Sequence, residues 1–268
     1  MIEIKNLHKQ FGKLEVLKGI DLAFNRPGTI TAVLGPNGSG KTTLIKSILG
    51  MVIPDQGEIR VDGELVKDHF AYRARIDYLP QIARFPENLT VRELISMIKD
   101  IRGNNSQEEK LIELFDLAPH LGKRLSYLSG GTKQKVNLTL AFMYDSPYLI
   151  LDEPTAGLDP IALIRLKDFI RQERQKGKTI IVTTHIISLV EELADEIVFL
   201  LEGNIYFRGT AQQLREKTRE ADLEHAIAAI LGGEKKSGMI KASLPSGIPY
   251  LNGHTVLPVM EQEDAADL

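Results

Sequence analysis

Apolar and polar residues alternate in two stretches near the start of the chain. The apolar positions are Ile2, Ile4, Val16, Ile20, Leu22 and Phe24. An alternation of period two is typical of antiparallel strands with one buried and one solvated face. Residues 29–34 then form an apolar run that ends at a glycine-rich turn, and residues 41–49 follow with a helical pattern. We therefore expect a β-rich start, then a buried strand, a turn and a helix.

The middle of the chain changes to a helical pattern and back. Residues 57–63 predict a hairpin arm, and residues 76–79 predict a short strand. Residues 85–145 carry apolar residues at helical spacing, so we expect a helical insertion there. Afterwards strands and helices alternate: a strand at 148–152, a helix from about 160, a strand at 179–183, a helix near 187, and strands at 197–201 and 204–208. Such alternation predicts an α/β fold with a mostly parallel sheet.

The composition is that of a globular protein. Of the 268 residues, 43% are hydrophobic and 26% are charged. The net charge of −3 gives no general attraction to nucleic acid, so we expect no nucleic-acid partner. The absence of cysteine excludes disulfides, thiolate metal sites and a cysteine nucleophile. No apolar run approaches the about 20 residues that span a bilayer, so we expect a soluble chain whose membrane role requires a partner.

The composition shifts again at Gly232-Gly233. We divide the chain there into a large N-terminal domain, residues 1–231, and a C-terminal tail, residues 232–268. Residues 234–238 are typical of a linker, and the remainder is rich in proline and glycine with an acidic end. Two interpretations stay open for the tail: a mobile segment, or a segment that docks onto a partner.

A phosphate-binding loop follows the apolar run at 29–34. The segment Gly35-Pro36-Asn37-Gly38-Ser39-Gly40-Lys41-Thr42 fits the GxxxxGK[ST] pattern. Glycines let backbone N–H groups turn toward a phosphate, and the following helix directs its N-terminus at the anion. Lys41 is expected to neutralise the β- and γ-phosphates of ATP, Thr42 to offer its hydroxyl to Mg²⁺, and Thr43 to contact the nucleotide. A chance glycine-rich turn is the alternative, but the flanking strand and helix favour a phosphate loop.

Two acids end the later strand at residues 148–152. Asp152 is expected to reach the Mg²⁺ ion, and Glu153 to face the γ-phosphate. Glu153 would either accept a proton from the attacking water or orient that water. With the phosphate loop, these acids predict a phosphate-loop NTPase core with a mostly parallel sheet, an N-terminal antiparallel β subdomain and a helical insertion.

The segment Leu128-Ser129-Gly130-Gly131-Thr132-Lys133-Gln134 resembles the LSGG signature of the ABC ATPase family. The resemblance implies that this segment opens a helix whose N-terminus binds the γ-phosphate held by a second subunit. The residue types agree, because Ser129 is a good helix N-cap and Gly130 and Gly131 leave N–H groups accessible to an anion.

The same resemblance, which covers about residues 1–230, assigns further residues. Gln81 is similar to the glutamine that touches Mg²⁺ and water, and Asp159, in Gly157-Leu158-Asp159, to the loop that crosses the dimer interface. His185 is similar to the histidine that contacts the γ-phosphate. Phe11 stands where the family has an adenine-stacking aromatic residue, usually tyrosine, and Val16 is expected to pack on the other side of the base or ribose. None of the departures from the family pattern removes a catalytic group, so we expect a competent ATPase.

The resemblance also implies partners. Two copies are expected to close around two ATP molecules, because the signature that completes each site belongs to the other copy. Separate transmembrane permease subunits would hold the motor on the cytoplasmic face of the inner or plasma membrane. Six residues after Gln81 are candidates for that contact, with ordinary core packing as the alternative: Arg84, Phe85, Pro86, Leu89, Thr90 and Glu93.

Within the family, the chain most resembles the motors of bacterial ABC-2-type exporters with separate membrane subunits. The run Leu158-Asp159-Pro160-Ile161-Ala162 is also similar to the ATPase that assists copper-site maturation of nitrous oxide reductase. No Cys or His cluster here could bind copper, so a metal would belong to partners. One alternative stays open: a soluble ABC ATPase that assembles a macromolecule or metallocofactor. A nucleotide-binding regulator without turnover conflicts with the presence of Glu153 and His185.

Overall fold

The computed structural model describes residues 1–67 and 69–237, with backbone only for residues 233–237. Residues 1–229 form one compact unit, and the chain from residue 230 onward is a second unit, considered by itself. The strands are β1 (Ile2–Phe11), β2 (Leu14–Phe24), β3 (Ile30–Leu34), β4 (Gln56–Val61), β5 (Glu64–Leu65), β6 (Ile76–Leu79), β7 (Tyr148–Asp152), β8 (Thr179–Thr183), β9 (Glu196–Leu201) and β10 (Asn204–Gly209). The α-helices are α1 (Lys41–Ile48), α2 (Val91–Arg102), α3 (Glu108–Leu114), α4 (Gly130–Phe142), α5 (Pro160–Gln175), α6 (Ile187–Leu193), α7 (Ala211–Thr218) and α8 (Leu223–Ser237).

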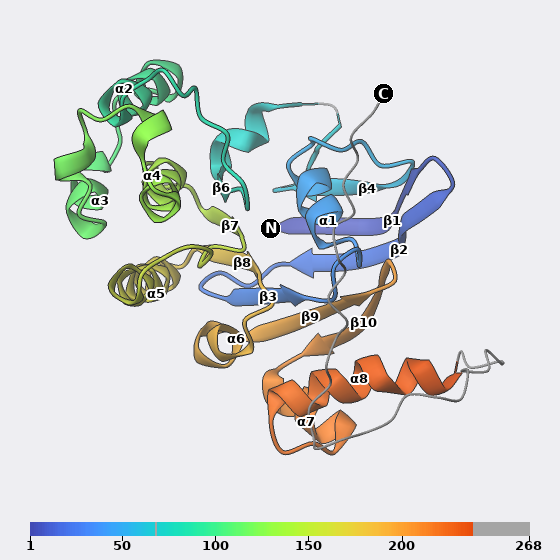
Figure 1. Ribbon diagram of the computed structural model, residues 1–268. Coiled ribbons are helices and arrows are strands. Elements are labelled where there is room, and N and C mark those ends of the chain that lie inside the picture. Colours follow the sequence, from blue (N-terminus) through green and yellow to red (C-terminus); the bar gives the residue numbers. More distant parts are fainter. Residues whose placement is uncertain (68, 238–268) are drawn as a thin grey trace, which may run out of the picture. The chain divides into compact units, whose positions relative to one another are not determined.

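The strands form two sheets (Figure 1). The first is antiparallel, in the order β2-β1-β4-β5, as the alternation near the start of the chain predicted. The second has the order β10-β9-β3-β8-β7-β6 and is parallel except at the edge strand β10. The predicted α/β fold is confirmed, and the carboxyl ends of β3, β7 and β8 share one edge of the six-stranded sheet.

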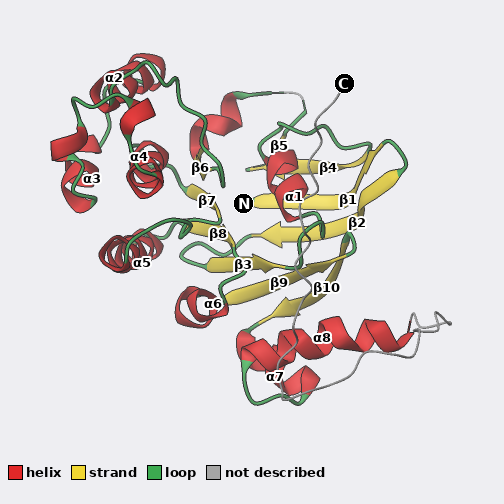
Figure 2. Ribbon diagram, viewed as in Figure 1, coloured by secondary structure: helices red, strands yellow, loops and turns green. Residues whose placement is uncertain are grey.

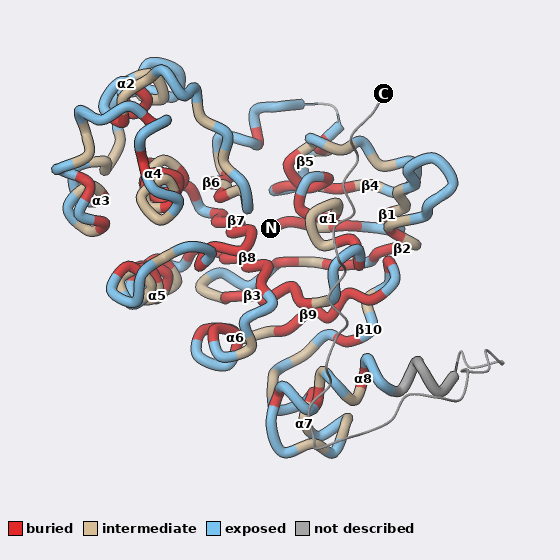
Figure 3. Tube along the Cα trace, in the orientation of Figure 1, coloured by how far each residue is buried: buried red, intermediate tan, exposed pale blue. Residues whose placement is uncertain are grey.

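The central strands of the six-stranded sheet are buried on both faces. Its strands β3, β7 and β8 consist entirely of buried residues (Figure 3). Successive residues of β7 face opposite ways: Leu149 and Leu151 join a core built with helices α2 to α6, whereas Ile150 joins a core built with α1 and the antiparallel sheet. Burial on both sides explains why these strands are continuous apolar runs rather than alternating ones.

The helical segment lies between β6 and β7 in the sequence and gathers on one side of the molecule (Figure 2). Helix α2 begins with a capping box, in which the Thr90 side chain accepts from the Glu93 N–H and the Glu93 carboxylate accepts from the Thr90 N–H. Helix α4 begins with Ser129 as its N-cap. The helical elements between residues 91 and 142 match the predicted insertion at 85–145.

One sequence prediction is wrong. Residues 234–237, expected to belong to a linker, lie in helix α8. The domain boundary after residue 231 stays a prediction. Each Gly in a helix costs about 1 kcal/mol relative to alanine, but the preceding helical turns continue through Gly232 and Gly233. The remainder of the predicted tail, from residue 238, is outside the described residues.

Candidate nucleotide site

The phosphate loop connects β3 to α1 at the carboxyl edge of the large sheet. The N-cap of α1 is Gly40, with a φ of 105° and no side-chain hydrogen bond to the helix, and no acidic residue lies in the first turn. The N–H groups at the start of α1 therefore have no side-chain cap and no nearby helix carboxylate to repel an anion. This end of α1 suits a phosphate group.

At Gly35 and Gly40 the loop packs so closely against neighbouring backbone that only glycine fits. A Cβ on Gly35 would lie 2.1 Å from the carbonyl oxygen of Leu200, and a Cβ on Gly40 would lie 2.9 Å from that of Val16. Real Cβ atoms do not approach backbone this closely, so any side chain at either position would displace the loop from β9 or β2.

Lys41 is folded into its own loop. Its ammonium donates hydrogen bonds to the carbonyl oxygens of Gly35, at 2.7 Å, and Pro36, at 3.1 Å. Burial lowers the pKa of Lys41, while the charges of Glu153 and Asp152 act in the opposite direction. The cation thus already lies beside the acids with which it is expected to share the nucleotide.

One hydroxyl from the neighbouring strand contacts the carboxylate of Asp152 and the backbone of Glu153. The Thr183 hydroxyl, at the end of β8, donates to the carboxylate of Asp152. The Glu153 N–H lies 3.0 Å from the Thr183 carbonyl oxygen and 3.3 Å from its hydroxyl oxygen. Burial raises the pKa of Asp152, the charge of Glu153 raises it further, and the Thr183 hydrogen bond lowers it. Thr183 has no signal of its own in the sequence, because its role depends on the pairing of β7 with β8.

Glu153 is placed by an uncommon backbone conformation. Its φ is +49°, in the left-handed region that few non-glycine residues adopt. This conformation ends β7 abruptly and leaves the side chain 11% exposed, where Oε2 lies 3.0 Å from Nδ1 of His185. The imidazole itself is 78% exposed. The structure therefore brings the predicted Glu153 and His185 together.

A cavity of about 300 Å³ collects most of the predicted ligands. It is lined by Phe11, Leu14, Val16, Asn37, Gly38, Gly40, Lys41, Thr42, Thr43, Gln81, Asp152 and Glu153. Leu14 was not among the predicted residues; it pairs with Phe11 across the β1–β2 turn. The apolar residues Phe11, Leu14 and Val16 can take a flat base, while the phosphate loop and acids surround the polar part of the cavity. Such a division suits a nucleoside triphosphate.

The comparisons with known proteins agree with this geometry. The family model described as "ABC transporter" matches residues 17–156. The daunorubicin resistance ATP-binding protein DrrA3 of Streptomyces coeruleorubidus is 34% identical, with 81% of this chain and 70% of the relative covered. This chain belongs to the ABC transporter family.

Further matches fit the same family. The Nod factor export ATP-binding protein I of Burkholderia orbicola is 33% identical, over 83% of this chain and 75% of the relative. The L-cystine import ATP-binding protein TcyN of Bacillus subtilis is 31% identical, over 82% of this chain and 90% of the relative. A solved structure of the ATP-binding subunit of an ABC transporter has a TM-score of 0.80 and 30% identity, and covers 86% of this chain and 99% of that one.

Family membership makes this chain an ATP-binding and ATP-hydrolysing motor subunit of a transporter. The resemblance to ABC-2-type exporter motors is in keeping with the exporter relative, whereas the suggested link to nitrous oxide reductase maturation finds no support in the comparisons. Among the described residues, no helix has the length and apolar character that crossing a membrane requires.

The ABC signature does not line the nucleotide cavity of its own chain. Ser129 and Gly130 are exposed, and the Ser129 hydroxyl accepts from the Thr132 N–H at 3.3 Å. Beside them, Lys135 forms a 2.7 Å ion pair with the predicted Asp159, whose carboxylate also caps α5 by accepting from the Ala162 N–H. The signature and the Asp159 loop therefore form one exposed patch, distinct from the cavity at the phosphate loop.

Three predicted loop residues also do not line the cavity: Gly35, Pro36 and Ser39. Gly35 and Pro36 instead supply the carbonyl oxygens that hold Lys41. The Ser39 hydroxyl is buried and has no hydrogen-bond partner within the protein. A buried hydroxyl without a partner is costly, so Ser39 is suited to a ligand that reaches the loop.

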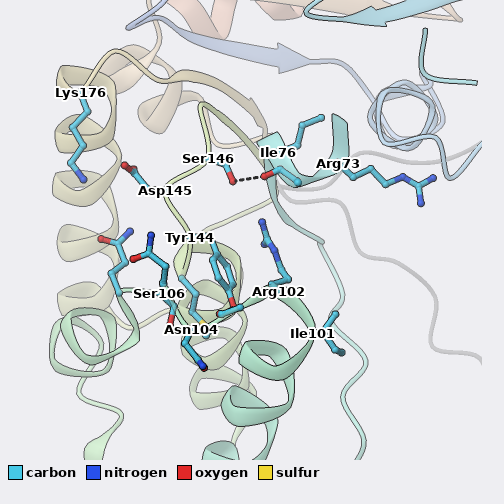
Figure 4. Close-up of a pocket in the computed structure, with 15 residues that line it drawn as sticks. Arg73, Ile76, Ile101, Arg102, Asn104, Ser106, Tyr144, Asp145, Ser146 and Lys176 are labelled. Atoms are coloured by element: carbon cyan, nitrogen blue, oxygen red, sulfur yellow. Dashed lines mark hydrogen bonds between the residues drawn. The ribbon is translucent and has the colours of Figure 1, made fainter. Parts of the chain in front are cut away.

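A larger cavity, about 1100 Å³, lies elsewhere and contains no predicted site residue (Figure 4). It borders Ile76 at the start of β6 and Ser146 just before β7, at the opposite edge of the sheet from the phosphate loop. Three of its four charged residues are in ion pairs: Arg102 with Asp77, Asp145 with Lys178, and Lys176 with Glu173. The fourth, Arg73, donates to the Gly50 carbonyl.

Proposed function

We propose that two copies of this chain close around two ATP molecules, each copy completing the site of the other with its signature, and that hydrolysis reopens the pair. The proposal rests on the separation between the ABC signature and the nucleotide cavity of the same chain. One chain gathers the phosphate loop, Gln81 and both acids on one cavity, but its own Ser129, Gly130 and Gly131 do not line it. A second copy would supply them, which makes closure dependent on nucleotide.

Magnesium fits the donors at this cavity. The hydroxyl of Thr42, the amide of Gln81 and the carboxylate of Asp152 offer the oxygen ligands that Mg²⁺ prefers, and the phosphates of ATP would supply the others. The described residues contain no group of three or more His, Cys, Asp or Glu side chains suited to a metal, so this mixed donor set is the one we assign. When bound, the ion would offset charge on the phosphates.

The reaction is the attack of water on the γ-phosphorus. A bond forms from the water oxygen to phosphorus, the bond from phosphorus to the bridging oxygen breaks, and ADP leaves with that oxygen. Glu153 would accept the proton of the water or orient it, while His185, 3.0 Å from Glu153, would contact the γ-phosphate. Lys41 would exchange its two carbonyl partners for phosphate oxygens.

The Glu153→Gln variant tests closure and chemistry together. It keeps the shape of the side chain but not its basicity, so we expect phosphate release to fall at least about a hundredfold while ATP still binds. Light scattering should show dimers with ATP and monomers without nucleotide. Glu202→Gln is the matched control, because Glu202 is an exposed glutamate with a φ of 46° in the β9–β10 turn. A Glu153→Gln protein that stays monomeric with ATP would count against the proposal.

Separate transmembrane subunits are the proposed partners, and the cytoplasmic face of the membrane is the proposed location. Of the six candidate contact residues, Phe85 and Leu89 pack against the core, and Thr90 and Glu93 form the cap of α2; Arg84 and Pro86 are exposed. Ile82, directly after Gln81, is 75% exposed. An exposed apolar residue beside a nucleotide-sensing loop supports a contact there.

Purification from native membranes tests the partner. We expect a polytopic membrane protein to copurify in roughly equal amount with the tagged chain, and substitution of Ile82 by Glu to abolish this. Recovery only from the soluble fraction would overturn the transporter assignment and favour the soluble assembly ATPase. If a membrane partner copurifies, transport in inside-out vesicles decides the direction. We propose export, which would appear as ATP-dependent uptake of substrate into these vesicles. ATP-dependent loss of substrate from them would show import instead.

A further inference from the structure

Two buried amides lie on the signature helix, about one and two turns after its start. Gln134 and Asn137 are 9% and 4% exposed, and they are three residues apart on α4, so they share one face of the helix. Their neighbours Val136 and Leu138 are fully buried apolar residues. A polar side chain in such surroundings is costly unless its hydrogen bonds are satisfied.

Each amide binds the backbone carbonyl of a proline. The Gln134 side chain donates to the Pro154 carbonyl at 3.2 Å, and the Asn137 side chain donates to the Pro80 carbonyl at 3.1 Å. The two amides also touch, since Asn137 Nδ2 lies 3.5 Å from Gln134 Oε1. The pair therefore joins two loops that are far apart in the sequence.

Both prolines lie next to residues that line the nucleotide cavity. Pro80 follows the end of β6 and precedes Gln81, whereas Pro154 directly follows Glu153 at the end of β7. Both carbonyls lie just beyond a strand, where the ladder no longer supplies a partner. A change in either hydrogen bond acts one residue from a side chain of the nucleotide cavity.

We infer that Asn137 is a positioning residue for ATP hydrolysis: together with Gln134 it fixes the loops of Gln81 and Glu153 to the signature helix. The inference rests on the roles proposed above for Gln81 and Glu153. It adds a physical connection between the two sites, because the same helix presents Ser129 and Gly130 at its exposed N-terminus. When nucleotide bound to the partner moves the signature, the helix therefore shifts the loops of Gln81 and Glu153 in this chain.

The test compares two variants with a matched control. Asn137→Leu and Asn137→Ala both remove the donor, the first with similar volume and the second with less strain. Thr139→Val is the control: Thr139 is fully buried on the same helix, but its hydroxyl bonds only to the Lys135 carbonyl within α4. We expect kcat to fall about tenfold in both Asn137 variants, with KM for ATP unchanged, and no change in Thr139→Val.

A spectroscopic readout separates positioning from general destabilisation. The chain has no cysteine, so Ile82→Cys, one residue after Gln81 and 75% exposed in the wild type, gives a single site for a spin label. The label should become more mobile when Asn137 is replaced and should not change when Thr139 is replaced. A folded Asn137→Leu or Asn137→Ala protein with wild-type kcat and wild-type label mobility would overturn the inference.

Glu153→Gln in the same assay keeps the two proposals apart. Loss of activity in Glu153→Gln with a wild-type rate in the Asn137 variants would refute only the role of Asn137. Retention of activity in Glu153→Gln would refute the assigned chemistry, and with it the basis of the inference.

Discussion

The hydroxyl of Thr183 donates a hydrogen bond to the carboxylate of Asp152, and the same oxygen lies 3.3 Å from the N–H of Glu153. One buried side chain on β8 thus touches both acids at the end of β7. The contact crosses between neighbouring strands, so the spacing of the acids depends on strand pairing as well as on their own sequence.

Replacing Thr183 by valine should therefore destabilise the protein. Valine keeps the shape of threonine but leaves the buried Asp152 carboxylate without its donor, which costs about 1–3 kcal/mol. Urea unfolding without nucleotide measures this loss. Thr218→Val is the control, because the Thr218 hydroxyl bonds only to carbonyls within α7. Equal destabilisation by the two substitutions would contradict the special role of Thr183.

Phe11 should contribute to binding rather than to the chemical step. Its ring lines the nucleotide cavity and is 50% exposed, so it is available to stack on adenine. Stacking on an aromatic ring contributes about 1–3 kcal/mol, so Phe11→Ala should raise KM for ATP about tenfold or more with kcat unchanged. Phe11→Tyr should bind as the wild type does, and Phe70→Ala, an exposed phenylalanine that does not line the cavity, should have no effect. A fall in kcat alone would show a different role.

Gly131 and Gly130 should differ although both belong to the signature. A Cβ on Gly131 would lie 2.8 Å from the Gly157 carbonyl oxygen, whereas a Cβ on Gly130 meets nothing within 4 Å. Gly131→Ala should therefore lower the free energy of unfolding of the isolated subunit by about 1–3 kcal/mol, and Gly130→Ala should leave it nearly unchanged. Denaturant unfolding of both variants checks this. Equal stabilities would mean that the loop at Gly157 yields readily.

Asp77 should make stability depend on pH. Its side chain is fully buried, and burial raises its pKa although Ser146 and Arg102 bind it. The native carboxyl holds its proton more tightly than the unfolded chain, so its contribution is complete below the unfolded pKa of about 3.9 and is lost as pH rises through the native pKa. The free energy of unfolding of Asp77→Asn, minus that of the wild type, should therefore increase from about pH 4 to about pH 7. Urea titrations across this range measure the difference. A constant or decreasing difference would contradict the raised pKa.

The sequence predicted those parts of the molecule that have local signals. The apolar run of β7 ending in two acids, and the glycines before Lys41, indicate their positions because strand burial and phosphate binding require those residue types in that order. Helices α7 and α8 were not predicted from the sequence, and the end of α8 was assigned to a linker because Gly232 and Gly233 are typical of one.

The contacts that sequence reasoning could not find are those between distant segments. Asn137 and Pro80 are 57 positions apart, and nothing near either residue indicates the other. The sequence around Thr183 indicates only a strand, and its contact with Asp152 follows from the pairing of β7 with β8. Such hydrogen bonds depend on the register of the folded elements, which composition and periodicity do not determine.

The folded-back Lys41 has a consequence for the enzyme between turnovers. If Lys41 binds ATP as proposed, the phosphates would replace its hydrogen bonds to the Gly35 and Pro36 carbonyls, and only the difference between the two sets would contribute to affinity. When ADP and phosphate leave, the same two carbonyls would be available to the ammonium again. On the proposed role of Lys41, these carbonyls therefore compete with the phosphates for its hydrogen bonds and would favour product release.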